Sequence, residues 1–158
     1  PITRLLKQLG LKPHDRVLII YENSIHFYQA YYGAWQTGAM IVPLNTYLHE
    51  KEIETIINDC KPSVILVSKK QRKKIETLHL TIPIVSDEMF EKKATETNND
   101  QDQLLPDLTM LVHDDQECVA LLYTSGTTGT PKGVMLSSKN IITNTMQGIA
   151  HFYVPRKE

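Results

Sequence analysis

The sequence contains few cysteines, almost no net charge and no long apolar run, and each absence excludes a class of protein. Cys60 and Cys118 have no cysteine or histidine partner at the sequence spacing of a metal site, and no two histidines lie at such a spacing from each other. We therefore expect reduced, buried thiols in a cytoplasmic protein, without a disulfide framework or a metal centre. A formal net charge of −1 gives no general attraction to nucleic acid or to an anionic membrane. No stretch approaches the roughly 20 apolar residues that span a bilayer, so no transmembrane segment is expected.

The remaining composition is that of an ordinary globular domain. Of 158 residues, 41% are hydrophobic and 22% are charged, which is enough apolar content for a substantial core. Apolar runs predict strands, of which the continuous run at 16–21 suits a strand buried on both faces, and a further short strand is expected at 133–136. The runs lie at 16–21, 39–44, 63–68, 81–85 and 118–123.

Apolar residues at helical spacing predict helices between these strands. Their starts are expected near Pro1, at Asn23 or Ser24, at His49, which is a poor capping residue, and at Ser137 or Ser138. The aromatic stripe of the second helix is interpreted as a face packed on the sheet rather than as a ligand surface. The expected buried faces are Leu5, Leu6 and Leu9; Ile25, Tyr28, Tyr32 and Trp35, with Phe27 and Tyr31 alongside; Ile53, Ile56, Ile57 and Cys60; and Ile141, Ile142, Thr145, Met146 and Ile149.

Strands that alternate with helices predict an α/β fold, a mostly parallel sheet with helices on both faces. The polar stretch at about 91–107 has little to bury and is expected to be a surface connector. The basic run at 69–74 is interpreted as a solvated helix face, since no aromatic residues interleave with it. Binding of nucleic acid by this run remains a weaker alternative.

A segment rich in glycine and hydroxyl residues follows the strand at 118–123 and has the chemistry of a phosphate-binding loop. Its glycines allow backbone N–H groups to approach a ligand, its hydroxyls can donate to phosphate oxygens, and its lysine supplies a positive charge. The segment is Thr124, Ser125, Gly126, Thr127, Thr128, Gly129, Thr130, Pro131, Lys132 and Gly133.

Two other interpretations of this loop are less favoured. A Walker-type loop places glycine before its lysine and serine or threonine after it, but Pro131 and Gly133 occupy those positions. A surface hairpin without a ligand would use the same turn-forming residues. Ligands of parallel sheets bind beyond the carboxyl ends of the strands, where this loop falls, and this position favours a binding site.

The run from Tyr123 to Gly133 resembles the phosphate loop of the adenylate-forming superfamily, which includes acyl-CoA synthetases, luciferases and peptide-synthetase adenylation domains. The stretches 10–17, 38–45 and 52–53 are similar to the opening of acyl-CoA synthetases in order and spacing. One departure is Ser137-Ser138, where many members have serine or threonine followed by histidine. The resemblance covers nearly the whole chain except the 91–107 connector.

The resemblance implies a two-step ligase. A carboxylic acid attacks the α-phosphorus of ATP to give an acyl-adenylate and pyrophosphate, and the thiol of coenzyme A then displaces AMP. The phosphates of ATP with its Mg²⁺ would be held by Thr124, Ser125, Gly126, Thr127, Thr128, Gly129 and Lys132. None of these residues is a nucleophile or a base, so they would act by stabilising the charge of the departing pyrophosphate.

The resemblance also implies that residues 1–158 are a partial N-terminal AMP-binding domain. The family's acyl pocket, magnesium-holding acid, ribose-binding aspartate and C-terminal lysine would lie beyond Glu158, together with the C-terminal domain. The chain alone is therefore expected to be inactive, and an uncovered sheet face could cause self-association. The alternatives are an adenylation domain, a ligase for aryl or small acids, and a nucleotide-binding module without catalysis.

Overall fold

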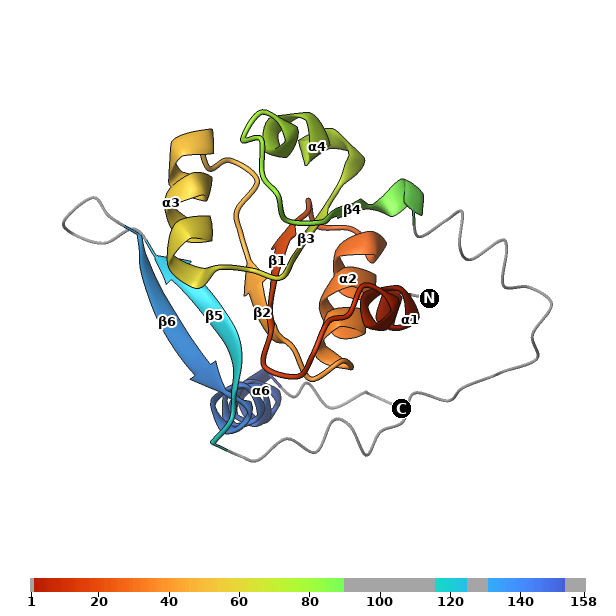
Figure 1. The fold of residues 1–158 in the computed structure, drawn as a ribbon. Helices are drawn as coiled ribbons and strands as arrows, with labels where there is room; N and C mark the ends of the chain where they lie inside the picture. The colour runs from red at the N-terminus through yellow and green to blue at the C-terminus, as the bar shows by residue number, and fades with distance from the viewer. Residues whose placement is uncertain (1, 90–115, 125–130, 153–158) are drawn as a thin grey trace, which may run out of the picture.

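In the computed structural model, which describes residues 2–89, 116–124 and 131–152, helices lie on both faces of a six-stranded sheet (Figure 1). The strand order is β4-β3-β1-β2-β5-β6, and all neighbouring strands are parallel except the antiparallel β5 and β6. This confirms the α/β class and the mostly parallel sheet. The strands are β1 (Arg16–Ile20), β2 (Met40–Pro43), β3 (Val64–Val67), β4 (Ile84–Ser86), β5 (Cys118–Thr124) and β6 (Lys132–Ser137).

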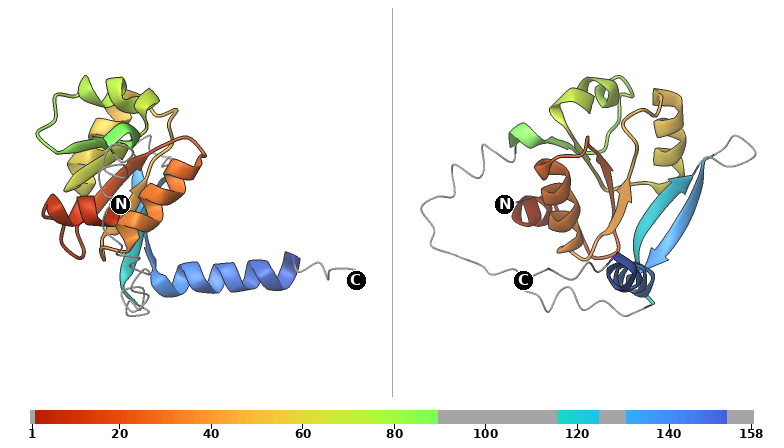
Figure 2. Two further views of the ribbon diagram at one scale, coloured as in Figure 1. Left: turned by 90° about the vertical axis from the view of Figure 1, so that its right-hand side faces the viewer. Right: turned by 180° about the vertical axis from the view of Figure 1, so that it is seen from behind.

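Alternate residues of the central strands point into two separate cores. Val17 and Ile19 of β1 pack with α1 (Ile2–Gln8) and α2 (Ile25–Trp35), whereas Leu18 and Ile20 pack with helices on the opposite face. Those helices are α3 (Glu50–Cys60) and α4 (Lys69–Glu76). All four β1 side chains are completely buried, which confirms a strand covered on both faces. Figure 2 shows the two helical layers on either side of the sheet.

The order of the strands explains why the helices divide between the faces. The chain moves from β1 to β2 in one direction along the sheet, and then returns past β1 to reach β3 and β4. Crossovers between parallel strands have a constant hand, so a reversal of direction moves the connecting helix to the opposite face. α2 therefore covers one face, and α3 and α4 cover the other.

Several predicted boundaries are confirmed, and one strand is shifted. Ser24 is the cap of α2 and accepts a hydrogen bond from the Phe27 N–H at 3.3 Å. α3 begins after His49, whose N–H donates to the Glu52 carboxylate at 2.8 Å, so the helix start is stabilised despite the poor cap. The fourth strand begins at Ile84 rather than residue 81 because Pro83, which has no N–H, precedes the ladder.

The predicted buried face of α2 is partly wrong, because only Trp35, Phe27 and Tyr31 of the expected residues pack against the core. Ile25, Tyr28 and Tyr32 are more than half exposed, with relative exposures of 67%, 55% and 52%. The helix instead buries the small residues Ala30 and Ala34 against the sheet, with partly buried Phe27, Tyr31 and Trp35 around them. Small residues at the contact allow the helix axis to approach the sheet, and this rotates the large aromatic stripe toward solvent.

The predicted apolar faces of α1 and the last helix also need correction. Leu5 and Leu6 are buried as expected, but Leu9 is 45% exposed because it follows the last residue of α1. The Ser137 hydroxyl accepts a hydrogen bond from the Asn140 N–H at the start of α6 (Ser138–Phe152), as expected of a cap. α6 projects away from the sheet in Figure 2, and its apolar face is exposed in the described part of the chain. The exposed residues of that face are Ile142, Met146 and Ile149.

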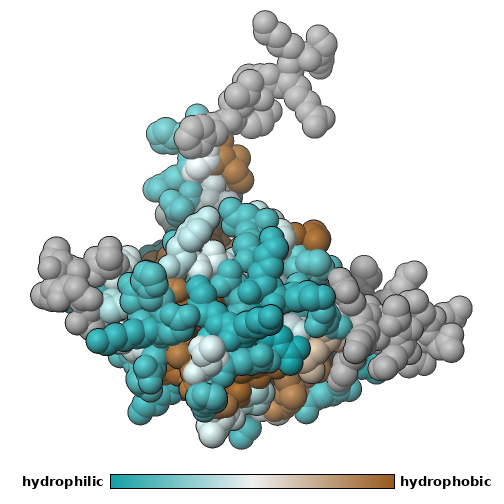
Figure 3. Space-filling model, turned by 90° about the horizontal axis from the view of Figure 1, so that it is seen from above, coloured by the Kyte–Doolittle hydropathy of each residue, from teal (hydrophilic) through white to brown (hydrophobic). Residues whose placement is uncertain are grey.

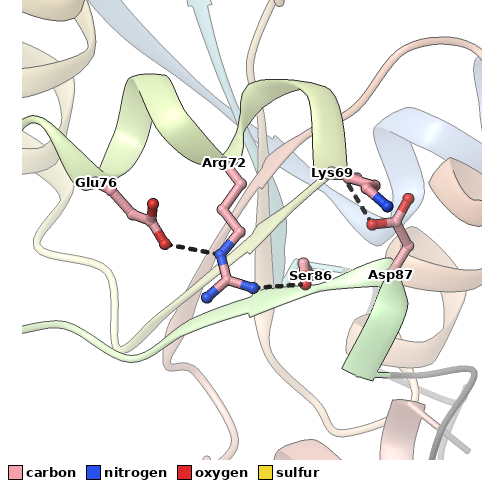
Figure 4. Close-up of polar contacts among 5 residues, drawn as sticks. All are labelled: Lys69, Arg72, Glu76, Ser86 and Asp87. Carbon is pink, nitrogen blue, oxygen red and sulfur yellow. Dashed lines mark hydrogen bonds and ion pairs between the residues drawn. The ribbon is translucent and has the colours of Figure 1, made fainter.

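The basic run forms the exposed helix α4, as predicted. Figure 4 shows the Arg72 guanidinium between the Glu76 carboxylate, at 2.7 Å, and the Ser86 hydroxyl. The Asp87 carboxylate accepts the Lys69 N–H at 2.9 Å and so caps the start of the helix. The view from this end of the molecule is mostly hydrophilic (Figure 3). The charges of this run are thus partly used within the chain, which disfavours the nucleic-acid interpretation.

The predicted connector at about 91–107 lies outside the described residues. Within the described ranges, no helix is both long and apolar enough to cross a membrane.

Candidate functional site

The two stems of the predicted phosphate loop form the end of an antiparallel hairpin. Thr124 is the last residue of β5, Lys132 is the first residue of β6, and the two residues pair directly. Side chains of a directly opposed pair lie on the same face of a hairpin. The Thr124 hydroxyl and the Lys132 ammonium, both exposed, therefore lie on one face at the entrance to the loop. The other predicted phosphate ligands, Ser125, Gly126, Thr127, Thr128 and Gly129, lie outside the described residues.

The opposite face of the hairpin is turned toward α3. Leu121 and Tyr123 are partly buried and pack against the core beneath α3, whereas Leu122 and Thr124 are exposed. This alternation follows from the pleat of a strand, which places successive side chains on opposite faces. One face of the hairpin is thus anchored in the protein, and the face that carries Thr124 and Lys132 is open to solvent.

Tyr123 connects the hairpin to the C-terminal end of α3. Its hydroxyl donates a hydrogen bond to the carboxylate of Asp59, in the last turn of that helix. In Figure 1 the β5–β6 hairpin passes beside this end of α3. Partial burial, followed by the hydrogen bond to Asp59, raises the pKa of Tyr123 well above its ordinary value. The hydroxyl therefore keeps its proton and acts as a donor at physiological pH.

Gly133 has a steric role next to Lys132. A Cβ atom at this position would lie 2.9 Å from Leu121 Cδ1 and 3.3 Å from Tyr123 Cζ. The Tyr123 ring therefore lies over Gly133 on the neighbouring strand. The sequence pattern explained this glycine by a bare backbone beside the Lys132 charge, and in the structure the space beside that backbone is taken by these two side chains.

The C-terminal end of α3 is held by a second group. Arg16 at the start of β1 donates from Nε to the Cys60 carbonyl at 2.7 Å and from Nη2 to the Lys61 carbonyl at 3.0 Å. A cation at this end of a helix satisfies carbonyls without helical partners and complements the helix dipole. The neighbouring Cys60 thiol is buried, and this burial, reinforced by the Asp59 charge, raises its pKa to about 11. The burial of Cys60 agrees with the expected buried thiol, whereas Cys118 is only partly buried.

Sequence reasoning identified Thr124 and Lys132 but missed Asp59. The one signal in the sequence was the position of Asp59 in the last turn of its helix, where a negative charge is unfavourable because the C-terminal end of the helix dipole is also negative. The partner of Asp59 is 64 residues away, so local patterns could not identify it. Within the described ranges, no cluster of three metal-binding side chains is present.

Comparison with known proteins identifies the family to which this chain is similar. The family model described as AMP-binding enzyme matches residues 2–157. A fatty acid–acyl-carrier-protein ligase from Streptomyces coeruleorubidus is 30% identical over 145 residues, covering 88% of this chain and 26% of that protein. The luciferin 4-monooxygenase of Photinus pyralis is 29% identical over 148 residues, covering 85% of this chain and 27% of that protein.

A solved structure shows the same fold. The fatty acyl-adenylate ligase from L. pneumophila, in complex with acyl adenylate and pyrophosphate, superimposes with a TM-score of 0.73 and 26% identity. The comparison covers 99% of this chain and 26% of that structure. The chain therefore spans about a quarter of the length of each of these three proteins.

Proposed function

Because the chain belongs to the AMP-binding enzyme family of adenylate-forming ligases, we propose that it is the N-terminal part of an ATP-dependent carboxylate–CoA ligase. In this proposal the full-length protein converts a carboxylic acid and ATP into an acyl-adenylate and pyrophosphate, and then transfers the acyl group to coenzyme A. The observation that carries it is the pairing of Thr124 with Lys132 on the solvent-facing side of the hairpin.

The chemistry of this pair fits the phosphates of ATP. The Lys132 ammonium supplies three donors and a positive charge, and the Thr124 hydroxyl supplies a donor on the adjacent strand. Both groups are exposed, so an anionic ligand can approach them without rearrangement of the core. We assign Thr124, Ser125, Gly126, Thr127, Thr128, Gly129 and Lys132 to the phosphates, with Mg²⁺ carried by the nucleotide.

These residues would act on the leaving group rather than on the acid. Adenylation breaks the bond between the α- and β-phosphates, and negative charge develops on the departing pyrophosphate. Donors held in place before the reaction stabilise that charge more effectively than water, which must reorient. The loop thereby lowers the barrier to the first step, and the acid and acceptor are bound elsewhere in the full-length protein.

The acceptor could also be a carrier protein, as the name of the Streptomyces relative indicates for that protein. A nucleotide-binding module without catalysis is the third candidate. These alternatives share the phosphate loop and differ in whether an acid is activated and where it is transferred.

The test is exchange of labelled pyrophosphate into ATP by the full-length protein, with carboxylic acids of several chain lengths. Acid-dependent exchange is expected, and it should decrease strongly in Lys132→Met, while Lys139→Met serves as a control because Lys139 is an exposed lysine of α6. Thioester formation from coenzyme A would then distinguish the CoA ligase from a carrier-protein ligase. Binding of ATP without exchange by any acid would refute the ligase and favour the binding module.

A further inference from the structure

We propose that Tyr123 is a positioning residue that holds both stems of the phosphate hairpin against α3, so that Thr124 and Lys132 face the same nucleotide. This inference rests on the proposed function of the hairpin as the ATP site. Tyr123 itself points away from that site and touches no substrate in the proposal. Its effect is transmitted through the residues next to it, Thr124 on its own strand and Gly133 on the opposite strand.

The first contact attaches the β5 stem to a fixed point. The Tyr123 hydroxyl donates to Asp59 in the last turn of α3, and the Cys60 thiol lies close enough to influence the same hydroxyl. This end of α3 is itself held by the two hydrogen bonds from Arg16. Cys60 and three isoleucines of α3 are buried in the core, so the helix offers a firm anchor.

The second contact involves the β6 stem. The Tyr123 ring lies over the bare backbone of Gly133, which directly follows Lys132. An aromatic ring over a cross-strand glycine fixes the register and the spacing of the two strands. A single side chain therefore contacts both stems of the loop, and displacement of the ring would move Thr124 and Lys132 relative to each other.

The hairpin needs such an anchor because it separates from the sheet before the loop begins. In the described part of the sheet, β5 pairs with β2 at Ala120 and Ile41, closer to the start of the strand than Tyr123. Beyond that point the directly paired outer side chains Leu122 and Val134 are exposed. Contacts on the α3 side, with Tyr123 nearest to the loop, thus hold the end of the hairpin.

The test combines ATP affinity with hydrogen exchange in the full-length protein. Tyr123→Phe keeps the ring over Gly133 but removes the hydroxyl, and Asp59→Ala removes the acceptor. We expect each variant to weaken ATP binding about three- to tenfold, the range that corresponds to loss of one hydrogen bond. Asp59→Asn keeps an acceptor oxygen and should bind ATP within about twofold of the wild type by the same reasoning. Tyr28→Phe, which removes an exposed hydroxyl from α2, is the matched control and should change nothing.

The two contacts predict a specific pattern of kinetics. KM for ATP should rise in Tyr123→Phe while KM for the acid stays constant, which a general loss of stability would not produce. The double variant Tyr123→Phe with Asp59→Ala should bind ATP no more weakly than the single variant with the lower ATP affinity, because both substitutions break the same hydrogen bond. Wild-type ATP affinity in Tyr123→Phe, or additive effects in the double variant, would overturn the inference.

Hydrogen exchange separates this inference from the proposed function. The amides of residues 123–124 and 132–133 should exchange faster in Tyr123→Phe than in the wild type, whereas those of α2 should not change. If the wild-type protein bound no ATP, the proposed function would fail, and hydrogen exchange would still measure the attachment of the stems. Unchanged exchange at both stems would overturn the role of Tyr123 whether or not ATP binds.

Discussion

Arg16 and Arg72 make hydrogen bonds of equal length, yet we expect their replacement by methionine to affect stability very differently. Nε of each arginine lies 2.7 Å from its acceptor. Arg16 reaches across 44 residues to the Cys60 carbonyl in a partly buried position, and it also binds the Lys61 carbonyl. Arg72 reaches four residues along the exposed surface of α4 to the Glu76 carboxylate, and its Nη1 lies 3.5 Å from the Ser86 hydroxyl, at the distance limit of a hydrogen bond.

The loss of stability expected for Arg16→Met follows from the two hydrogen bonds that the substitution removes. A hydrogen bond from a charged group contributes about 1.5–3 kcal/mol, and an exposed one less because water can replace the donor. The bond to Cys60 is partly buried and the bond to Lys61 is exposed, so Arg16→Met should cost about 2 kcal/mol. For a chain of this length that corresponds to a decrease in Tm of about 4–8 °C. Methionine keeps an unbranched apolar stem, so loss of packing contributes little.

For Arg72→Met we expect a midpoint of urea unfolding that is indistinguishable from that of the wild type. Exposed ion pairs gain little because water solvates both charges and two long side chains lose freedom. Urea unfolding of the chain, followed by circular dichroism, measures both variants against the wild type. Equal decreases in the free energy of unfolding for the two substitutions, or a larger decrease for Arg72→Met, would refute the reasoning that burial and chain separation determine how much each hydrogen bond stabilises the fold. High salt should leave the loss from Arg16→Met almost unchanged.

Three further predictions concern the loop, the first helices and a thiol. Lys132→Met should weaken ATP binding by the full-length protein at least ~10-fold without changing Tm, because a charged donor is lost from an exposed position. Titration calorimetry measures the affinity, and scanning calorimetry measures Tm. Gly33→Ala places a Cβ 2.9 Å from two atoms of Ile2, so overpacking of about 1–3 kcal/mol should outweigh the helix-propensity gain of about 1 kcal/mol. Urea unfolding should therefore show lower stability, and higher stability would contradict this contact. Cys60, with a pKa near 11, should be about 0.1% thiolate at pH 8, so it should react slowly with iodoacetamide. The rate of alkylation should increase about tenfold per pH unit up to that pKa.

Much of the fold could be predicted from local patterns. The strand at β1 is an uninterrupted apolar run, and such a run has no stable arrangement in water except burial on both faces. The alternation of strands and helices then restricts the topology to a mostly parallel sheet. A phosphate-binding role for the loop stays a prediction from the sequence, which rests on glycines, hydroxyls and a lysine that are poorly suited to packing and well suited to binding an anion.

The faces of the helices could not be predicted with the same success. In α2 the large aromatic stripe and the small residues Ala30 and Ala34 both have helical spacing, and the pattern favoured the larger side chains. Which face packs depends on how closely the helix can approach the sheet, a property of the whole interface. α6 shows the same limit, since its apolar stripe was recognised but its surroundings could not be inferred.

Local sequence patterns were enough to predict the class of fold, the strand β5 that ends at Thr124 and the anion-binding chemistry proposed for Thr124 and Lys132. Each of these depends on neighbouring residues, whose spacing is set by covalent geometry. The contact of Asp59 with Tyr123 and the position of the Tyr123 ring over Gly133 became visible only in the folded chain. Those contacts join residues distant along the chain, and they depend on the twist and packing that bring the hairpin against the end of α3.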